Sequence, residues 1–250
     1  IIGRLVGSEM CIRDRYETSP VEELNKIGSD WQAKTPKGLI TASKVILAVN
    51  GNIENFGYFN NSLLHIYTYG SITQKLTPDQ IKILGGKKEW GITPADPLGT
   101  TVRRISGIGG DRIVIRNRFT YNPNMSPNKS ILDNVLRSHV KSFSDRFPML
   151  KDIKLSQTWG GHLTLSRNNV AAFGELKPGL FSACCQNGLG TVKGTLHGLA
   201  AADLAMGKKT ALVEQLLNNP KPKKLPFKPL TKIAVSSRIK LGELLAGKEL

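Results

Sequence analysis

The sequence predicts a mixed α/β fold in which a layer of antiparallel sheet is inserted between two parts of a domain built on a parallel sheet. Three segments support this class. Residues 45–49 form a short, wholly apolar run, which is typical of a parallel strand buried on both faces. Residues 101–121 read as two antiparallel strands around a glycine-rich hairpin. Residues 179–207 give an apolar strand, a glycine-containing turn and a helix in direct succession.

The segments before the apolar run also read as strands. PVEELNKIG (20–28) and DWQAKT (30–35) alternate loosely, PKG (36–38) supplies a turn, and GLITA (38–42) returns. The apolar run then ends at Asn50 and Gly51. Because ligands in open α/β sheets bind beyond the carboxyl ends of strands, a cofactor is expected to meet the chain at these two residues.

Residues 59–154 are predicted to form the inserted layer. Thr77 and Pro78 have the order of a capping residue and a first helical residue, and Gly85-Gly86 would end that short helix. A longer helix is expected from Ser130 to about Phe143, with Ser130 and Asp133 spaced as in a capping box. One face of this helix would carry Leu132, Val135, Leu136, His139 and Phe143. His139 is therefore expected to be a packed or half-exposed helix residue and no ligand.

Size and cysteine content narrow the class of protein. A chain of 250 residues with 40% hydrophobic content can bury one sizeable core or two smaller ones. It contains no run of eighteen apolar residues, so no membrane span is expected. Cys11 stands alone, and the adjacent Cys184 and Cys185 are poorly placed to bridge each other. This cysteine usage indicates a reducing compartment, and a cytoplasmic protein is expected.

The formal net charge of +16 is concentrated towards the end of the chain. From Gly207 onward there are ten Lys or Arg against three Glu, and PKPKKLPFKP (220–229) is typical of an extended surface segment. A basic module that binds nucleic acid or acidic surfaces is the alternative function. Because no base-stacking aromatic residues alternate with these lysines, nucleic acid is not the expected partner.

The first residues are set aside from the fold argument. GRLVGSEMCIRDR, within residues 1–15, resembles a peptide produced when sequencing-adapter DNA is translated in frame. The alternative is a short basic leader. On the first interpretation the chain is the C-terminal part of a longer protein.

The turn and helix within residues 179–207 are the segment most directly tied to chemistry. Gly188 and Gly190 free the first amides of the helix, and an uncapped helix N-terminus favours phosphate or developing negative charge. A βαβ unit that opens a dinucleotide-binding domain needs a second strand and an acidic residue about twenty residues later. A Pro-Lys segment follows instead, so we reject that interpretation. A plain tight turn remains the structural alternative.

An ordered set of short motifs resembles the second half of the FAD-dependent D-amino-acid oxidase superfamily, in its glycine, sarcosine and γ-glutamylputrescine oxidase branch. The motifs are ETSPV (17–21), VILAVNG (45–51), TWGG (158–161), LTLSRN (163–168), FGEL (173–176), CCQNGLGTVKG (184–194) and AADLAMG (201–207). The resemblance covers most of residues 16–215. It implies FAD as cofactor and an amine or amino acid as the small-molecule substrate, with hydride passing from the carbon that bears the amine to flavin N5 and an imine as product.

The resemblance also assigns cofactor contacts residue by residue. Val21 would meet the adenine, and Ala48, Asn50 and Gly51 would lie beside the pyrophosphate and ribose. Trp159, Gly160 and Gly161 would pass the flavin ring. The helix start would face the pyrimidine edge of the flavin through Asn187, Gly188, Leu189, Gly190, Thr191 and Val192. Amides at a helix N-terminus suit the negative charge that a reduced flavin gathers at that edge.

The sequence also departs from the family pattern. The G-x-G-x-x-G turn is absent, and Ser166-Arg167-Asn168 replaces a Thr-x-Asp that precedes Pro. Val192 stands where some relatives hold a substrate carboxylate with Lys, so that role is not transferred. An anionic substrate group would need a cation, and Arg104, Arg116 and Arg167 are the candidates. No catalytic acid or base is assigned.

Other kinds of site receive little support. The four His lack spacing suited to zinc, so no metal is expected, and no G-x-S-x-G motif occurs. His162 could face the flavin, although a satisfied structural His is the simpler expectation. The predicted division is a partial FAD-binding domain (16–58 and 155–217), a substrate or cap domain (59–154) and a basic tail (218–250).

Overall fold

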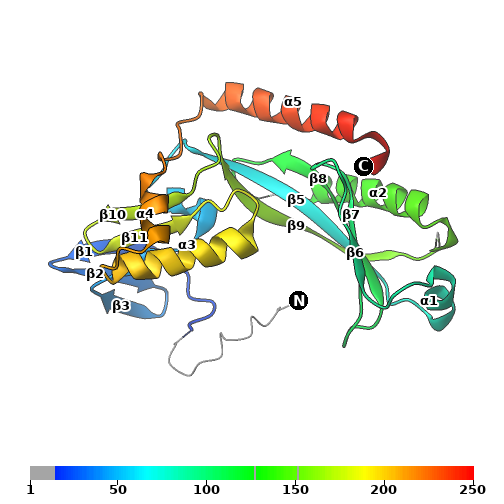
Figure 1. Cartoon of the computed structure of the whole chain (residues 1–250), viewed down its shortest axis with the longest axis horizontal. Coiled ribbons are helices and arrows are strands. Elements are labelled where there is room, and N and C mark those ends of the chain that lie inside the picture. Colours follow the sequence, from blue (N-terminus) through cyan, green and yellow to red (C-terminus); the bar gives the residue numbers. More distant parts are fainter. Residues whose placement is uncertain (1–14, 127, 151) are drawn as a thin grey trace.

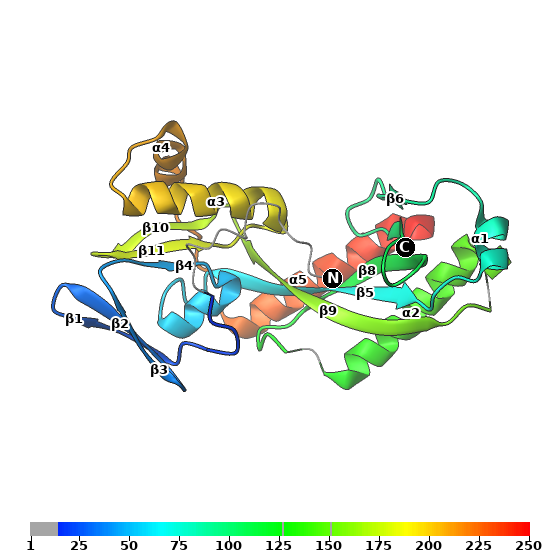
Figure 2. The same ribbon diagram turned by 90° about the horizontal axis from the view of Figure 1, so that it is seen from below.

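The computed structural model describes residues 15–126, 128–150 and 152–250, and the chain folds into two parts that lie side by side, each called a layer below (Figure 1). The expected leader therefore lies outside the described residues, apart from Arg15. One layer contains two three-stranded sheets, and the other contains a five-stranded antiparallel sheet. The long strands β5 and β9 run through the five-stranded sheet, as the second view shows (Figure 2). This arrangement confirms the predicted mixed α/β class with an antiparallel layer.

The smaller layer combines an antiparallel meander with a mixed sheet of order β10-β11-β4. The only parallel pair among the described strands joins β11 to β4, and α3 and α4 pack on β11 and β10. Its elements are β1 (Glu23–Ile27), β2 (Asp30–Thr35), β3 (Gly38–Ala42), β4 (Val45–Leu47), the 3₁₀ helix Asn50–Phe56, β10 (Ala172–Lys177), β11 (Leu180–Cys184), α3 (Gly190–Ala205) and α4 (Ala211–Asn218).

The larger layer has the strand order β6-β7-β8-β5-β9, with every neighbouring pair antiparallel. Its elements are β5 (Leu63–Thr73), α1 (Pro78–Leu84), β6 (Trp90–Ile92), β7 (Thr101–Ile105), β8 (Arg112–Tyr121), α2 (Lys129–Arg146), β9 (Leu155–Ser166), α5 (Lys228–Ala246) and the 3₁₀ helices Pro148–Leu150 and Gly247–Glu249. Ile113 and Ile115 of β8 are fully buried against Phe143 of α2, which places the core between sheet and helix.

The boundary between the layers differs from the predicted position at residue 155. β9 pairs with β5 along almost its whole length, from Leu155 opposite Thr73 to Ser166 opposite Leu63. Backbone pairing therefore assigns β9 to the antiparallel layer, and the chain crosses to the other layer only after Ser166. The expectation for residues 45–49 also needs correction, because the strand is shorter and Ile46 is 40% exposed.

The basic tail is also more ordered than an extended segment. Residues 219–227 carry no helix or strand, but α5 follows at once and packs along β8. Pro229 lies in its first turn, where the missing amide hydrogen costs nothing. Proline and lysine therefore mark the approach to a helix, and the predicted tail of residues 218–250 becomes part of the folded antiparallel layer.

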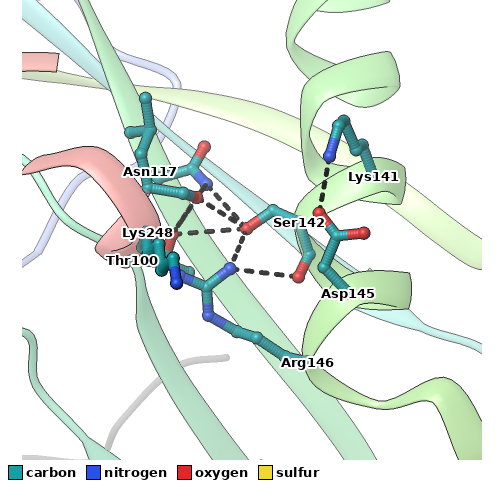
Figure 3. Close-up of polar contacts among 8 residues, drawn as sticks. Thr100, Asn117, Lys141, Ser142, Asp145, Arg146 and Lys248 are labelled. Atoms are coloured by element: carbon teal, nitrogen blue, oxygen red, sulfur yellow. Dashed lines mark hydrogen bonds and ion pairs between the residues drawn. The ribbon is translucent and has the colours of Figure 1, made fainter. Parts of the chain in front are cut away.

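A polar cluster fastens the end of α5 to the sheet and to α2 (Figure 3). The carbonyl oxygen of Leu250 accepts hydrogen bonds from Ser142 Oγ at 2.7 Å, Thr100 Oγ1 at 2.6 Å and Asn117 Nδ2 at 3.2 Å. Arg146 donates to the carbonyl oxygen of Glu249 at 2.6 Å. Four side chains, two from α2, one from β8 and one from the residue before β7, therefore hold the chain just after α5.

The predicted helix signals are partly confirmed. Thr77 caps α1 with a complete capping box, and Gly85 follows its last residue. The N-cap of α2 is Asn128, whose side chain accepts from the amide of Ile131, so the predicted cap at Ser130 was wrong by two residues. Asn serves as well as Ser at this position, and the helix simply starts earlier. Among the described residues, no helix is long and apolar enough to cross a membrane.

Candidate functional site

The turn between β11 and α3 is held in place by one side chain. Asn187 adopts a left-handed backbone conformation, with φ of 51°, and Gly188 follows with φ of 82°. The side-chain oxygen of Asn187 accepts from the amide of Ser166 at 2.8 Å, and its nitrogen donates to the carbonyl of Val170 at 3.0 Å. Asn187 therefore ties this turn to the end of β9, where the two layers meet.

The N-terminus of α3 is open. The helix begins at Gly190, and its N-cap residue Leu189 makes no side-chain capping hydrogen bond. A Cβ atom at Gly190 would meet nothing within 4 Å, and no acidic residue lies in the first turn. Gly190, Thr191 and Val192 are all exposed. The helix therefore presents free amides and the positive end of its dipole, which suits a phosphate or an electron-rich ring.

One face of the antiparallel sheet continues from this turn. Directly opposed residues on antiparallel strands point to the same face. The row Arg116, Gly70 and Trp159 crosses β8, β5 and β9, and Leu163 lies opposite Ile66 further along. Trp159 covers Gly70 so closely that a Cβ there would lie 2.8 Å from the indole. Cationic and aromatic groups thus stand at one end of an otherwise apolar face.

This sheet face, the turn and α5 enclose a cavity of about 730 Å³. Its size falls within the range of about 300–1,000 Å³ usual for small-molecule sites. Gly188 and Leu189 line it from the turn, Leu163 and Leu165 from β9, and Val235 from α5. Segments far apart in the sequence thus meet around one apolar space, and α5 forms its cover, as its position above the strands indicates (Figure 1).

Two of the three candidate arginines line this cavity. Arg116 is half-buried and donates to the hydroxyls of Thr101 at 3.0 Å and Thr68 at 3.4 Å. Burial, reinforced by the nearby charge of Arg103, lowers the pKa of Arg116 below its ordinary value. Arg167 reaches the cavity from the residue after β9.

The third candidate, Arg104, was a wrong prediction. Its side chain is 97% buried and donates to the carbonyls of Gly85 and Lys87 at 2.7 and 3.1 Å. It also pairs with Asp111 at 3.4 Å. Arg116 lies opposite Thr101 and on the same face of the sheet, whereas Arg104, three residues after Thr101 on β7, points to the other face. Arg104 therefore stabilises the region of α1 and the hairpin.

The glycines of TWGG lie on different faces of β9. Trp159 and Gly161 share the cavity face, whereas a Cβ at Gly160 would lie 3.1 Å from the ring of Tyr69 on the other face. Trp159 is 44% exposed. Of the three residues expected to pass a flavin ring, Gly160 is thus explained by packing against tyrosine, and Trp159 and Gly161 are oriented towards the cavity side.

Of the residues expected at the adenine and ribose end, only Val21 lines a second cavity, of about 910 Å³. Val49 also lines it. Ala48 is exposed, and the side-chain oxygen of Asn50 accepts from the amide of Cys185 at 3.3 Å. Gly51 is buried, and a Cβ there would come within 2.6–2.9 Å of Thr164, His162 and His65. Close packing within the chain therefore explains why residue 51 is glycine.

His162 points away from the cavity under α5 and belongs to a polar chain that the sequence did not predict. Its Nε2 lies 3.1 Å from Nδ1 of His65, whose Nε2 lies 2.6 Å from Oε2 of Glu54. Burial, with a smaller contribution from His65, lowers the pKa of His162. The sequence signal for this polar chain is weak: Glu54 follows closely after Asn50 and Gly51. His65 lies on β5 and comes close to Glu54 only in the folded chain.

The neighbouring thiols are inert. Cys184 and Cys185 are buried and unbridged, as their adjacency predicted. Burial raises the pKa of Cys185 to about 11, so the thiol stays protonated at neutral pH.

These features define a class of protein. A parallel strand pair ends at an open helix N-terminus, and that end faces an apolar cavity floored by an antiparallel sheet; this arrangement is that of an α/β protein with a small-molecule site beside an open helix N-terminus. Sequence comparison then gives the family. Residues 14–204 match the FAD dependent oxidoreductases (DAO), and the chain belongs to this family.

Known proteins of similar sequence and structure agree with this assignment. The chain is 24% identical over 214 residues to a probable oxidoreductase, OrdL, of Rhizobium meliloti (strain 1021), covering 85% of this chain and 47% of that protein. Its fold resembles glycine oxidase from Geobacillus kaustophilus, with a TM-score of 0.60 and 18% identity over 84% of this chain and 53% of the other.

A second solved structure is the fructosamine oxidase (Amadoriase II) of Aspergillus fumigatus, with a TM-score of 0.57 and 15% identity over 78% of this chain and 49% of the other. The chain thus spans about half the length of the proteins it matches.

Proposed function

We propose that this chain forms the substrate layer and the ring-binding part of an enzyme that oxidises an amine or an amino acid. The observation that carries the proposal is the uncapped N-terminus of α3, whose preceding residues Gly188 and Leu189 line the apolar cavity on the sheet. FAD dependence follows from the family, and the names of the similar structures, an oxidase of glycine and one of fructosamine, favour an amine as the group oxidised.

The residues present fit a flavin at this position. The residues from Asn187 to Val192 would hold the pyrimidine edge through backbone amides, because a Cβ at Gly190 meets open space and no side chain competes for those amides. Trp159 and Gly161 would border the ring from the sheet. Val21, Ala48, Asn50 and Gly51 are proposed for the nucleotide end, in agreement with the cavity that Val21 lines.

The chemistry divides between cofactor and protein. When bound, the flavin supplies an acceptor for the hydride that leaves the carbon bearing the amine, and the resulting imine hydrolyses. The positive end of α3 stabilises negative charge at the near edge of the cavity without rearrangement. The apolar sheet residues Leu163, Leu165 and Ile66 exclude water from the site.

A matched pair of glycine variants tests the role of the turn. Gly188 and Gly207 lie before and after α3, and both have positive φ, of 82° and 77°. Gly188→Ala and Gly207→Ala therefore impose similar backbone strain, of about 1 kcal/mol. After incubation with FAD and gel filtration, we expect the parent and Gly207→Ala to retain flavin absorbance that amines bleach without oxygen. Gly188→Ala should retain little.

Two results would contradict the proposal. Equal flavin retention by both variants would remove the turn from the binding site. A parent protein that stays colourless with FAD supplied would remove the flavin site from this chain.

A further inference from the structure

The cavity under α5 contains Arg167 beside the turn and two further cations, Arg116 and Arg238, at the end remote from the turn. Asn187 fixes the turn next to Ser166, which lies opposite Leu63. Arg116 lies opposite Gly70, seven residues further along β5. At about 3.4 Å per residue, the backbone of Arg116 is roughly 24 Å along the strand from the turn. The cavity is therefore elongated, and the guanidinium of Arg116 enters it from the far end.

A second arginine approaches the same end from the cover. Arg238 lines the cavity from α5, one helical turn before Gly242. Gly242 packs against Leu98, which also lines the cavity. In the sequence, Leu98 lies three residues before Thr101, the hydrogen-bond partner of Arg116. The contacts of Gly242 and Leu98 thus place Arg238 towards Arg116 and away from the turn.

Neither cation has an acidic partner in the part of the chain that the structure describes, where no carboxylate lies within ion-pair distance of Arg116 or Arg238. Arg116 bonds only to threonine hydroxyls, although a half-buried charge is ordinarily paired. Between this end and the turn the sheet presents Leu163, Leu165, Leu64 and Ile66. Two unpaired guanidinium groups thus face one end of an apolar space.

We propose that Arg116 and Arg238 form a subsite for an anionic group, and that the enzyme takes amines whose hydrocarbon chain carries a carboxylate at the end remote from the amine. This inference rests on the proposed function for the position of the amine, next to the turn. The carboxylate accepts hydrogen bonds from both guanidinium groups, and the hydrocarbon lies on the leucine and isoleucine floor. α5 is then the element that determines substrate specificity, and a substrate with a cationic far end is rejected.

Binding of simple probes tests the subsite without turnover. Octanoate, hexanoate and octylamine are titrated by calorimetry into the FAD-incubated protein. We expect octanoate to bind and hexanoate, which is two methylenes shorter, to bind more weakly by about fifteenfold, because each buried methylene contributes roughly fourfold. Octylamine should not bind at the same site, since it brings a cation to two arginines. Octylamine binding as tight as octanoate binding overturns the proposal.

Arginine variants test whether octanoate binds at this subsite or responds only to the positive charge of the protein as a whole. Arg116→Met and Arg238→Met should each weaken octanoate binding by roughly tenfold or more. Arg112→Met is the matched control, because Arg112 lies on the same strand but donates to the carbonyls of Gly109 and Thr73. It should bind octanoate as the parent does. Arg238 is exposed on α5, so its variant keeps the test valid if Arg116→Met unfolds. Parent-like binding by Arg238→Met overturns the proposal.

Flavin absorbance in the same samples separates this inference from the proposed function. Octanoate binding that depends on both arginines in a protein without flavin would support the anion subsite and contradict the proposed oxidation. Flavin that amines bleach, together with no preference for octanoate over octylamine, would support the proposed oxidation and overturn the subsite.

Discussion

At the residue scale, glycines mark the places where the two layers approach each other. Gly188 is required by its backbone conformation, and Gly190 leaves space open in front of α3. Gly51 is different, because its neighbours leave no room for a side chain. Packing within the chain is therefore sufficient to explain why the motif VILAVNG ends in Gly51.

Gly51→Ala should destabilise the fold. A Cβ would lie 2.6 Å from Thr164 Oγ1 and 2.7–2.9 Å from the rings of His162 and His65. Overpacking of this kind costs about 1–3 kcal/mol of unfolding free energy, measurable by urea denaturation. Gly38→Ala is the control, since Gly38 lies in a strand with nothing within 4 Å of its Cβ position. Equal stability of both variants would contradict the close packing at Gly51.

Arg104 and Arg116 show where residue-level prediction stops. Both are arginines on neighbouring strands of one hairpin, and composition cannot tell them apart. Their roles differ because they point to opposite faces of the sheet. Arg104 points to the core face of β7 and contacts Gly85, Lys87 and Asp111. Arg116 points to the cavity face of β8. The register of β7 with β8 decides this, because it pairs Arg116 with Thr101 and Arg104 with the buried Ile113.

At the element scale, local signals predicted most helices and strands. The strands of residues 20–50, α1, the hairpin of β7 and β8, and the strand–turn–helix of β11 and α3 all followed from periodicity and turn residues. α5 did not. Its apolar residues are diluted by lysine and serine, and several remain exposed, among them Ile233, Leu244 and Leu245. Contacts with β8 and the polar cluster around Leu250 stabilise its position, and both are long-range.

Ser142→Ala should loosen α5. Ser142 is buried, donates to the carbonyl of Leu250 and accepts from Arg146 at 2.6 Å. Loss of such bonds costs about 1–3 kcal/mol, so amide hydrogen exchange in α5 should accelerate while exchange in β5 stays unchanged. Lys141→Ala removes only an exposed ion pair with Asp145 and serves as the control (Figure 3). Unchanged exchange in α5 would show that the cluster does not hold it.

At the scale of the whole molecule, the antiparallel layer carries a buried titratable group in its centre. His139 of α2 is fully buried, with Nδ1 accepting from Ser71 Oγ at 2.7 Å and Nε2 donating to the carbonyl of Asn117 at 3.4 Å. Burial is the main cause that lowers the pKa of His139 to about 4, and the charge of Arg118 acts in the same direction. The expectation of a packed helix residue is confirmed.

Stability of the whole chain should therefore fall in mild acid. The unfolded chain binds a proton at His139 near pH 6.5, whereas the folded chain does so only near pH 4. The stabilisation is complete above about pH 6.5 and decreases as the pH falls towards 4, by up to about 3 kcal/mol. Urea denaturation across this range measures the slope. His139→Gln, which does not titrate, should show a shallower slope, and an equal slope would exclude His139 as its source.

The division into layers was predicted in outline and missed in detail. Composition and motif order gave the two layers and the turn before α3, because each depends on local sequence. The assignment of β9 to the antiparallel layer, the chain from Glu54 to His162, and the cavity cover depend on strand pairing across a hundred residues. No local pattern carries that information.

The alignment of α5 with the strands limits how ligand length could be altered. One helical turn advances about 5.4 Å, roughly the span of four methylene groups. An arginine at Ala234, a turn closer to α3, would select shorter molecules. The opposite change is opposed, because a side chain at Gly242 would collide with the side chain of Leu98, which would have to move. If the proposed subsite holds the ligand, a single substitution would shorten the preferred ligand, whereas lengthening it would require Leu98 to move or change as well.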